Sequence, residues 1–520
     1  MNPSVIVIGA GPGGLASAML LASAGVKVKL LERMPIVGGR TSAIQTDGLK
    51  FDLGPTFFLY PRVLDEIFAA AGANLRHEVE LVRLDPQYRI IFGGGGELNA
   101  TPDITRMEQQ IGVIAPEDAP GFRRFLEENR VKHDRMLPCL ENPFLGWPDM
   151  LQPRLLRALP MLRPHQSVDT YLSRFFRDSR IRLAFSFQSK YLGMSPFRCP
   201  SLFSILSFLE YEYGVFHPIG GCAAVTAAMA RVAERLGVEI CLSQPVEQIL
   251  FDGRRAVGVR TKEGVLPADA LIMNADFARG ISRSSSASLD RPQDRRKKFS
   301  CSTFMMYLGV EGSFDLPHHN IHISADYAQN LDEIENQHLL SDDPSFYAIY
   351  SEGIPAPDPT CYVCAPAITE AAVAPPGGEA LYVLVHTPYL RPGHDWQRML
   401  PRYRRIILDK LKRAAGMEDI ESRIVFEQAL TPEDIDRRYH VLKGAIYGLA
   451  SHGRFFGAFK PSNRRPDVSG LYLAGGAAHP GPGVPMVLMS GWIAADALDK
   501  DVGLQRARKS PARAKQGVAQ

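Results

Sequence analysis

The sequence predicts an α/β protein built on a discontinuous Rossmann-type domain that is interrupted by inserted segments. Three observations support this: a strand–turn–helix–strand unit at the start of the chain, a return of the same pattern near residue 220, and a glycine-rich strand–turn–helix segment near residue 470. Alternating strands and helices are typical of a parallel sheet covered by helices. The chain has 520 residues, which is too long for one core and indicates at least two domains.

The first segment has every part of a dinucleotide-binding unit. Gly9, Gly11 and Gly14 give the G-x-G-x-x-G spacing after a buried strand, and Glu32 follows the second strand. Gly9 permits the tight turn, Gly11 lets the backbone approach a pyrophosphate, and Gly14 lets the helix pack closely on the strand. The helix N-terminus offers N–H groups to phosphates, and a carboxylate after the second strand can accept hydrogen bonds from ribose hydroxyls. We therefore predict a bound dinucleotide rather than an ordinary βαβ unit.

The composition restricts the possible partners. Hydrophobic residues make up 45% of the chain and charged residues 22%, as in ordinary globular proteins, and a net charge of +3 gives no reason to expect nucleic acid. The seven cysteines are odd in number and scattered, which indicates a reducing compartment rather than a disulfide framework. The first apolar stretch lacks a signal-peptide pattern, and no apolar run is long enough to span a bilayer, so any membrane contact is expected to be peripheral.

Changes of pattern along the chain predict its division into segments. The nucleotide-binding domain is expected to consist of three pieces, with a helical region and a mixed α+β substrate domain inserted between them. The predicted boundaries are 1–85, 216–280 and 431–502 for the nucleotide-binding pieces, 86–215 for a mainly helical region facing substrate and membrane, 281–430 for the substrate domain, and 503–520 for a basic disordered tail.

Two further features favour a flavin over a nicotinamide. Gly39 and Arg40 follow the acidic residue closely, where they bring backbone and a forked cation to the pyrophosphate. Near the C-terminus, the strand-like segment 470–476 ends in a turn, and a helix is expected after Pro485. The N-terminus of such a helix can face the flavin ring and stabilise its reduced anion.

Four segments resemble one known family. They are V-I-V-I-G-A-G-P-G-G-L (5–15), L-E-R-M-P-I-V-G-G-R (31–40), F-D-L-G-P-T (51–56) and L-Y-L-A-G-G-A-A-H-P-G-P-G-V-P-M-V (471–487). With them, nearly the whole chain to about residue 500 resembles the bacterial carotenoid desaturases. That family includes phytoene and diapophytoene desaturases and related carotenoid oxidases, within the amine-oxidase-like flavoproteins. The resemblance implies an FAD-dependent enzyme that introduces conjugated double bonds into a linear isoprenoid.

The resemblance also implies which residues hold FAD in this Rossmann-type FAD-binding domain. The expected contacts are Gly9, Gly11, Gly13, Gly14, Glu32, Arg33, Gly39, Arg40, Gly54, Pro55, Val246, Gly475, Gly476, Val484, Pro485 and Met486.

Apolar and aromatic residues near the second glycine-rich segment and at helical spacing after residue 202 are candidates for a substrate tunnel. They are Phe57, Phe58, Tyr60, Phe203, Leu206 and Tyr213. Such stripes also form plain core, and some residues can do both.

Few residues are candidates for the chemistry itself. Desaturation needs a hydride acceptor more than an acid–base pair, and the cofactor supplies it, so no catalytic triad is expected. His479 is the candidate catalytic residue at the flavin end of the tunnel, with a structural hydrogen bond as the alternative role. Cys361 and Cys364 have redox-motif spacing, but they lie in a strand-like stretch and have no second pair, so neither redox nor zinc binding is predicted. No metal site is expected.

Three alternative functions remain open. The segments K-G-A-I-Y-G-L-A (443–450), R-F-F-G-A-F-K-P (454–461) and S-D-D-P-S-F-Y (341–347) resemble carotenoid end-group oxidases, which act on terminal methyls. An amine oxidase is disfavoured because many of them carry an acidic residue where this chain has Gly476. A non-catalytic prenyl-binding escort protein would not need an intact nucleotide motif. For the enzyme, we expect a location on the cytoplasmic face of the cell membrane and quinone or oxygen as electron acceptor, and the oligomeric state is open.

Overall fold

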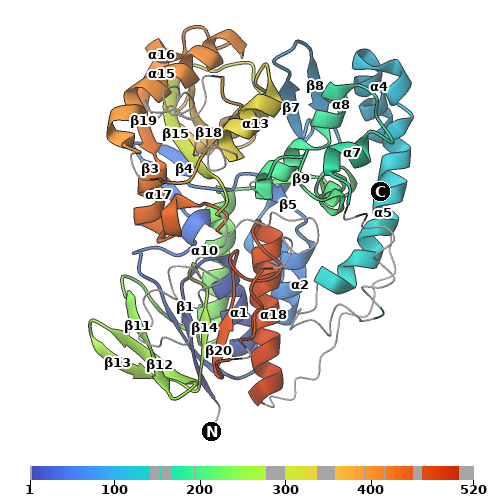
Figure 1. Cartoon of the computed structure of the whole chain (residues 1–520). Coiled ribbons are helices and arrows are strands. Elements are labelled where there is room, and N and C mark those ends of the chain that lie inside the picture. The colour runs from blue at the N-terminus through green and yellow to red at the C-terminus, as the bar shows by residue number, and fades with distance from the viewer. Residues whose placement is uncertain are drawn as a thin grey trace.

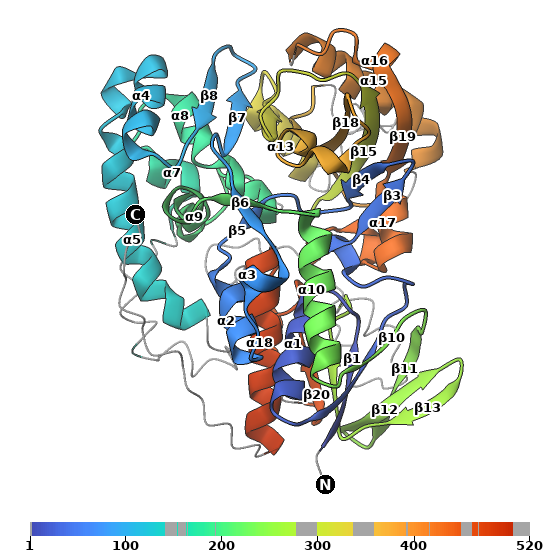
Figure 2. The same cartoon turned by 180° about the vertical axis from the view of Figure 1, so that it is seen from behind.

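The computed structural model describes residues 3–140, 153, 163, 165–192, 194–276, 299–335, 358–391, 394–414, 416–448, 460–465 and 467–502. In both views, a parallel sheet lies at the end that carries the N-terminus (Figure 1 and Figure 2). Beyond it, a helical region around α5 and α9 and a strand-rich region around β15 and β18 lie side by side. The predicted basic tail 503–520 falls outside the described residues.

The parallel sheet is assembled from segments far apart in the sequence. Its strands are, in spatial order, β10 (Glu239–Cys241), β2 (Lys27–Leu31), β1 (Ser4–Ile8), β14 (Ala270–Met273) and β20 (Leu471–Leu473). All neighbours pair in parallel. This is the discontinuous α/β arrangement that the sequence predicts.

Both faces of this sheet are covered, which explains why β1 is apolar throughout. Val5 and Val7 pack in the cluster formed with three helices, and Ile6 packs in the cluster on the other face. The helices are α1 (Pro12–Ser23), α10 (Gly221–Arg235) and α18 (Val484–Val502), and the opposite face is covered by an antiparallel sheet of β11 (Val246–Asp252), β12 (Arg255–Thr261) and β13 (Gly264–Pro267).

A seven-stranded sheet forms the substrate side. Its strands are, in spatial order, β19 (Ile424–Leu430), β15 (Ser302–Glu311), β18 (Gly378–Thr387), β17 (Cys361–Cys364), β16 (His319–His322), β7 (Tyr88–Ile91) and β8 (Glu97–Ala100). One face packs against α15 (Trp396–Ala414) and α16 (Ile420–Arg423). Residues 88–100 therefore form strands, although the sequence predicts a mainly helical region there, because β7 pairs with the distant β16.

The rest of this region is described by its helices. Its helices are α4 (Ile104–Ile114), α5 (Gly121–Leu140), α7 (Val168–Leu172), α8 (Ser179–Ala184) and α9 (Ile205–Tyr213). Shorter elements join the regions: β3 (Ala43–Thr46), β4 (Leu49–Asp52), β5 (Phe58–Leu59), α2 (Arg62–Ala70), α3 (Leu75–Glu78), β6 (Leu81–Arg83), β9 (Val215–Pro218) and α13 (Tyr327–Glu335). No helix in the part of the chain that the structure describes is long and apolar enough to cross a membrane.

One helix lies in a different region from the one predicted. α17 (Pro432–Tyr439) begins with a capping box between Thr431 and Asp434. Its Ile435 is buried with Met305 and Tyr307 of the seven-stranded sheet. Residues 432–439 therefore pack with the substrate side, although the sequence predicts a nucleotide-binding segment from residue 431 onward. The other domain boundaries remain predictions.

A buried lysine joins two helices of the helical region. Lys132 on α5 is 1% exposed, its Nζ donates to Ser204 Oγ over 3.0 Å, and it lies 3.6 Å from the centroid of the Tyr171 ring. Burial lowers the pKa of Lys132 to about 7, although Glu128 opposes this effect. At neutral pH Lys132 is therefore uncharged in about half of the molecules.

This lysine predicts a dependence of stability on pH. In the unfolded chain the ammonium keeps its proton up to about pH 10.5, whereas in the fold it loses it near pH 7. The unfolded state binds more protons between these values, so stability rises with pH across this window. We expect Lys132→Met to remove this rise and to increase the melting temperature at pH 7 by about 2–5 °C. Thermal denaturation at neutral and alkaline pH checks this, and an equally steep rise in the variant would contradict it.

Candidate active site

A cavity of about 590 Å³ extends from the turn after β1 to the helical region. This volume is within the range of small-molecule sites in proteins. At one end the wall contains Gly11, Glu32 and Arg40, and at the other end it contains Leu206 and Leu209. The dinucleotide motif and the apolar stripe of the sequence therefore share one cavity.

The glycine-rich turn leaves the first turn of α1 open to an anion. Gly9 has a φ of +98°, which favours glycine, and Gly11 caps α1 without any side chain. No acidic residue lies in the first helical turn. A Cβ on Gly14 would lie 2.1 Å from the Gly9 carbonyl oxygen, so only glycine permits this packing of helix on strand. The N–H groups of α1 can thus meet a pyrophosphate, as the sequence predicts.

Glu32 is held in place by backbone groups at the rim of the cavity. Its Oε2 accepts from the Ala10 N–H over 2.7 Å and its Oε1 accepts from the Met34 N–H over 2.8 Å. The side chain is buried, yet the residue lines the cavity. Each carboxylate oxygen keeps a free acceptor position, which suits two ribose hydroxyls.

The two arginines of this region reach across to α17 and to the segment that follows it. The Arg33 guanidinium donates to the Arg438 carbonyl, and the Arg40 guanidinium donates to the Ile446 carbonyl. Burial lowers the pKa of Arg40, and Asp276 opposes this effect. An arginine stays protonated at neutral pH despite such a shift, so the wall carries a fixed positive charge.

The C-terminal helix α18 contributes its N-terminus to the same wall. Val484, Pro485 and Met486 all line the cavity. The helix begins at Val484, one residue before Pro485, whereas the sequence predicts that the helix begins after the proline. Proline fits the first turn of a helix because that turn leaves its N–H groups unpaired. The helix dipole therefore points its positive end at the cavity.

Asn274 connects three segments that meet at the cavity. It follows β14, and its side-chain amide donates to the Gly9 carbonyl over 3.2 Å. A Cβ on Gly13 would lie 2.8 Å from Asn274 Oδ1, and one on Gly475 would lie 2.6 Å from it. The sequence does not identify Asn274 as a site residue, because its role depends on contacts between segments about 200 residues or more apart.

Comparison with known proteins identifies the family. The family model described as flavin-containing amine oxidoreductase matches residues 12–279, which is just over half of the chain. The chain belongs to this family. A relative named 4,4'-diapophytoene desaturase (4,4'-diapolycopene-forming), from Methylomonas, is 36% identical and covers 94% of each chain. A zeta-carotene-forming phytoene desaturase from Myxococcus xanthus is 34% identical, covering 95% of this chain and 93% of the relative.

One further relative and one solved structure are also similar to this chain. A 4,4'-diapolycopene oxygenase from Methylomonas is 32% identical and covers 96% of this chain and 99% of its own. An oxidoreductase structure from Methanosarcina mazei matches 95% of this chain with a TM-score of 0.61 at 18% identity, which supports the fold alone. The predicted α/β fold, the carotenoid desaturase family and FAD as cofactor are confirmed.

The residues expected to hold FAD are largely brought together. Those that line the cavity are Gly9, Gly11, Glu32, Arg33, Gly39, Arg40, Gly54, Pro55, Val246, Gly475, Gly476, Val484, Pro485 and Met486. Gly13 and Gly14 lie behind this wall, where their lack of a side chain allows close packing. The open helix terminus, the carboxylate and the arginine together fit a flavin dinucleotide.

The expected tunnel residues divide into two groups. Phe57, Tyr60, Phe203 and Leu206 line the cavity, whereas Phe58 and Tyr213 do not. Phe58 points into the core because successive residues of a strand face opposite sides. Tyr213 lies behind Tyr60, with the two ring centroids 4.9 Å apart.

The seven-stranded sheet supplies residues of the cavity wall that the sequence does not predict to be site residues. They are Thr303, Met305, Ile321, Tyr362, Tyr382 and Leu384, and Lys190 of the helical region joins them. They come from strands whose pairing is long-range, so no local pattern marks them.

His479, the predicted catalytic residue, does not lie in the cavity wall as described, although Ala477 and Pro480 do. Its N–H donates to the Pro461 carbonyl, and its carbonyl accepts from Asn463 Nδ2 over 2.9 Å. The imidazole is 6% exposed. Both hydrogen bonds are made by the backbone of His479, so they hold the turn in place and leave the role of the imidazole a prediction.

We expect His479→Ala to keep turnover within about threefold of the unmodified enzyme, because loss of a general acid or base costs about 10²–10⁴-fold. The measurement is product formed per bound FAD, which separates chemistry from cofactor loss. A variant that retains FAD but loses activity about 100-fold would restore the catalytic role.

Proposed function

We propose that this protein is an FAD-dependent desaturase of linear carotenoid precursors of the phytoene or dehydrosqualene type. The observation that carries the proposal is the single cavity that joins the dinucleotide turn to an apolar wall. The names of its full-length relatives support the same activity. FAD, when bound, supplies the hydride acceptor for this chemistry.

The protein's own residues orient the substrate and exclude water. Phe203, Leu206 and Leu209 present an apolar surface along which a polyene chain can lie, with no hydrogen bonds to satisfy. The N-terminus of α18 and Arg40 place positive charge at the opposite end of the cavity. This division puts the apolar chain and the charged dinucleotide at separate ends of one site.

The alternatives fit the cavity less well. An amine oxidase would have to bind a cationic amine beside Lys190, which lines the wall. An escort protein would have no use for the complete FAD motif around Gly11 and Glu32. One observation supports an end-group oxidase: the chain is also similar to a diapolycopene oxygenase. Of the three segments that resemble that branch, 341–347 and most of 454–461 lie outside the described residues.

We further propose that the enzyme collects its substrate at the cytoplasmic face of the membrane and passes electrons to quinone or oxygen. The support for this is chemical: a long hydrocarbon partitions into the bilayer, so the enzyme must meet it there. Sedimentation of the FAD-loaded protein with liposomes tests the first part. Reoxidation of the reduced protein by a soluble quinone under nitrogen tests the second part.

Product analysis tests the proposed reaction. Purified, FAD-loaded protein in liposomes receives phytoene, dehydrosqualene or diaponeurosporene in parallel reactions. The products are separated by chromatography and identified by mass spectrometry. We expect loss of hydrogen pairs and a longer chromophore, with the preferred substrate giving the chain length. Gain of oxygen on diaponeurosporene, without desaturation of the other two, would assign the protein to the end-group oxidases.

A further inference from the structure

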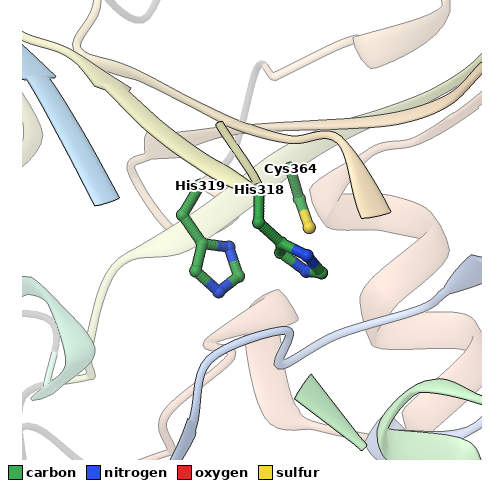
Figure 3. Close-up of side chains that lie close together, drawn as sticks. All are labelled: His318, His319 and Cys364. Atoms are coloured by element: carbon green, nitrogen blue, oxygen red, sulfur yellow. The ribbon is translucent and has the colours of Figure 1, made fainter. Parts of the chain in front are cut away.

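Three metal-ligating side chains meet next to the wall of the FAD cavity. They are His318, His319 and Cys364, and Figure 3 shows both imidazoles and the thiol extending from the strands to the same side. Their possible ligand atoms all lie within 4.8 Å of one another. The three residues are 3%, 0% and 2% exposed, so water has little access to them.

The pairing of the strands explains why these residues meet. His319 of β16 and Cys364 of β17 are direct partners in an antiparallel pair. Side chains of direct partners point to the same face of the sheet. His318 comes immediately before β16, and the Ala365 N–H donates to its carbonyl over 2.8 Å, which holds its backbone beside β17.

Each imidazole has one nitrogen occupied and one without a partner. His318 Nδ1 lies 2.7 Å from Thr369 Oγ1, and His319 Nδ1 lies 2.7 Å from the Tyr362 hydroxyl. Among the described residues, neither Nε2 has a hydrogen-bond partner. Leaving one buried polar atom unpaired is unfavourable, so two together need an explanation. Metal-ligating histidines typically have this pattern, with the second nitrogen bonded to a polar group.

Coordination needs a neutral imidazole at each histidine and a thiolate at Cys364. The thiol proton is released when a metal ion binds, which makes the affinity depend on pH.

We propose that His318 Nε2, His319 Nε2 and Cys364 Sγ bind a divalent transition-metal ion, for which zinc is the best match. Two neutral imidazoles and one thiolate are ligands that zinc prefers, and the thiol proton leaves to solvent on binding. Bonds of about 2.0–2.1 Å to nitrogen and 2.3 Å to sulfur require the ligand atoms to move closer together. Nε2 of His319 points away from the thiol in Figure 3, so that ring must also turn when the ion binds. The site uses Cys364 without Cys361, and it departs from the expectation from the sequence, which is that there is no metal site.

The ion would have a structural role at the edge of the active site. It would join β16 to β17 and fix the His319 tautomer, with Nδ1–H directed at the Tyr362 oxygen. Tyr362 lines the cavity and also hydrogen-bonds with Thr56 Oγ1 over 2.6 Å. The metal would therefore hold a wall tyrosine in one orientation without touching the substrate.

Metal analysis and zinc K-edge absorption test the proposal. The full chain, loaded with FAD and carrying no oligohistidine tag, is produced in zinc-supplemented medium and dialysed. We expect about one zinc per chain, with one sulfur at about 2.3 Å and nitrogens at about 2.0–2.1 Å. Zinc below about 0.1 per chain, or an absorption spectrum without sulfur, would overturn the proposal.

Matched variants separate this site from adventitious binding. Cys364→Ser and His319→Gln should each lose the zinc, and Tyr362→Phe should weaken zinc binding about 10- to 100-fold. His322 and Cys361 form another cross-strand pair on the same two strands, so Cys361→Ser is the control and should keep the zinc. Equal loss of zinc from Cys361→Ser would contradict the proposal. Where a Cys364 variant does not fold, the spectrum of the unmodified protein decides.

Discussion

Replacing Gly14 with alanine is expected to produce a protein that no longer retains FAD. The added Cβ would lie 2.1 Å from the Gly9 carbonyl oxygen and 3.1 Å from Asn274 Nδ2. Real Cβ atoms do not approach backbone so closely, so either the turn after β1 or the start of α1 must move. Both provide the N–H groups that we expect to meet the pyrophosphate. A clash of this kind costs about 1–3 kcal/mol or more, which lowers FAD affinity by about 5- to 150-fold or more.

The flavin absorbance that remains after gel filtration measures this effect. Gly94→Ala is the matched control because a Cβ at Gly94 meets no atom within 4 Å and the backbone there has no positive φ. The control should keep its full complement of FAD and its melting temperature. A Gly14→Ala protein that retains FAD as the control does would show that the turn is not the phosphate site.

The second large effect is expected at the apolar end of the cavity. Leu206→Glu places a carboxylate in the wall beside Phe203 and Leu209. An unpaired charge in such a surface costs several kcal/mol, and a polyene offers it no partner. We expect kcat/KM for the carotenoid precursor to fall by more than about 100-fold. FAD binding should stay intact, since the dinucleotide residues lie at the other end.

Val113→Glu is the control for Leu206→Glu, because Val113 is 85% exposed on α4 and does not line the cavity. Turnover of the precursor in liposomes and the visible flavin spectrum are measured for both variants. Unchanged turnover in Leu206→Glu would mean that the substrate does not lie along α9. Loss of FAD from that variant would mean that the two ends of the cavity are not independent.

Local patterns predict the FAD end of this site well. The motif from Gly9 to Glu32 lies within one βαβ unit, so its geometry follows from the sequence of a single segment. The C-terminal glycine-rich turn is predicted for the same reason, with the helix start displaced by two residues. Where strand, turn and helix adjoin in sequence, the position of each group is determined by short-range geometry.

The substrate end is predicted less completely because its wall depends on long-range pairing. Tyr362 and His319 lie 43 residues apart and meet only because β16 pairs with β17. Strands β7 and β8 form in a segment predicted to be mainly helical, since β7 pairs with β16, more than 200 residues away, and β8 pairs with β7. The pattern of tunnel residues gives the correct region, but strand alternation decides that Phe57 faces the cavity and Phe58 does not.

The prediction for His479 shows a related limit. A family-specific motif places this residue near the flavin, but the sequence does not say which side of the turn its side chain faces. In the structure Ala477 and Pro480 face the cavity, while Asn463 holds the His479 carbonyl. Proximity of a segment to a cofactor therefore does not establish a catalytic role for each of its polar residues.

Anaerobic reduction of the bound flavin by substrate tests the central claim most directly. FAD-loaded protein in oxygen-free liposomes is mixed with dehydrosqualene, phytoene or putrescine, and the visible absorbance of oxidised flavin is followed. We predict bleaching by at least one of the two isoprenoids, none by putrescine, and none with Leu206→Glu. Bleaching by putrescine, or no bleaching by either isoprenoid, would contradict the conclusion that this FAD protein desaturates carotenoid precursors.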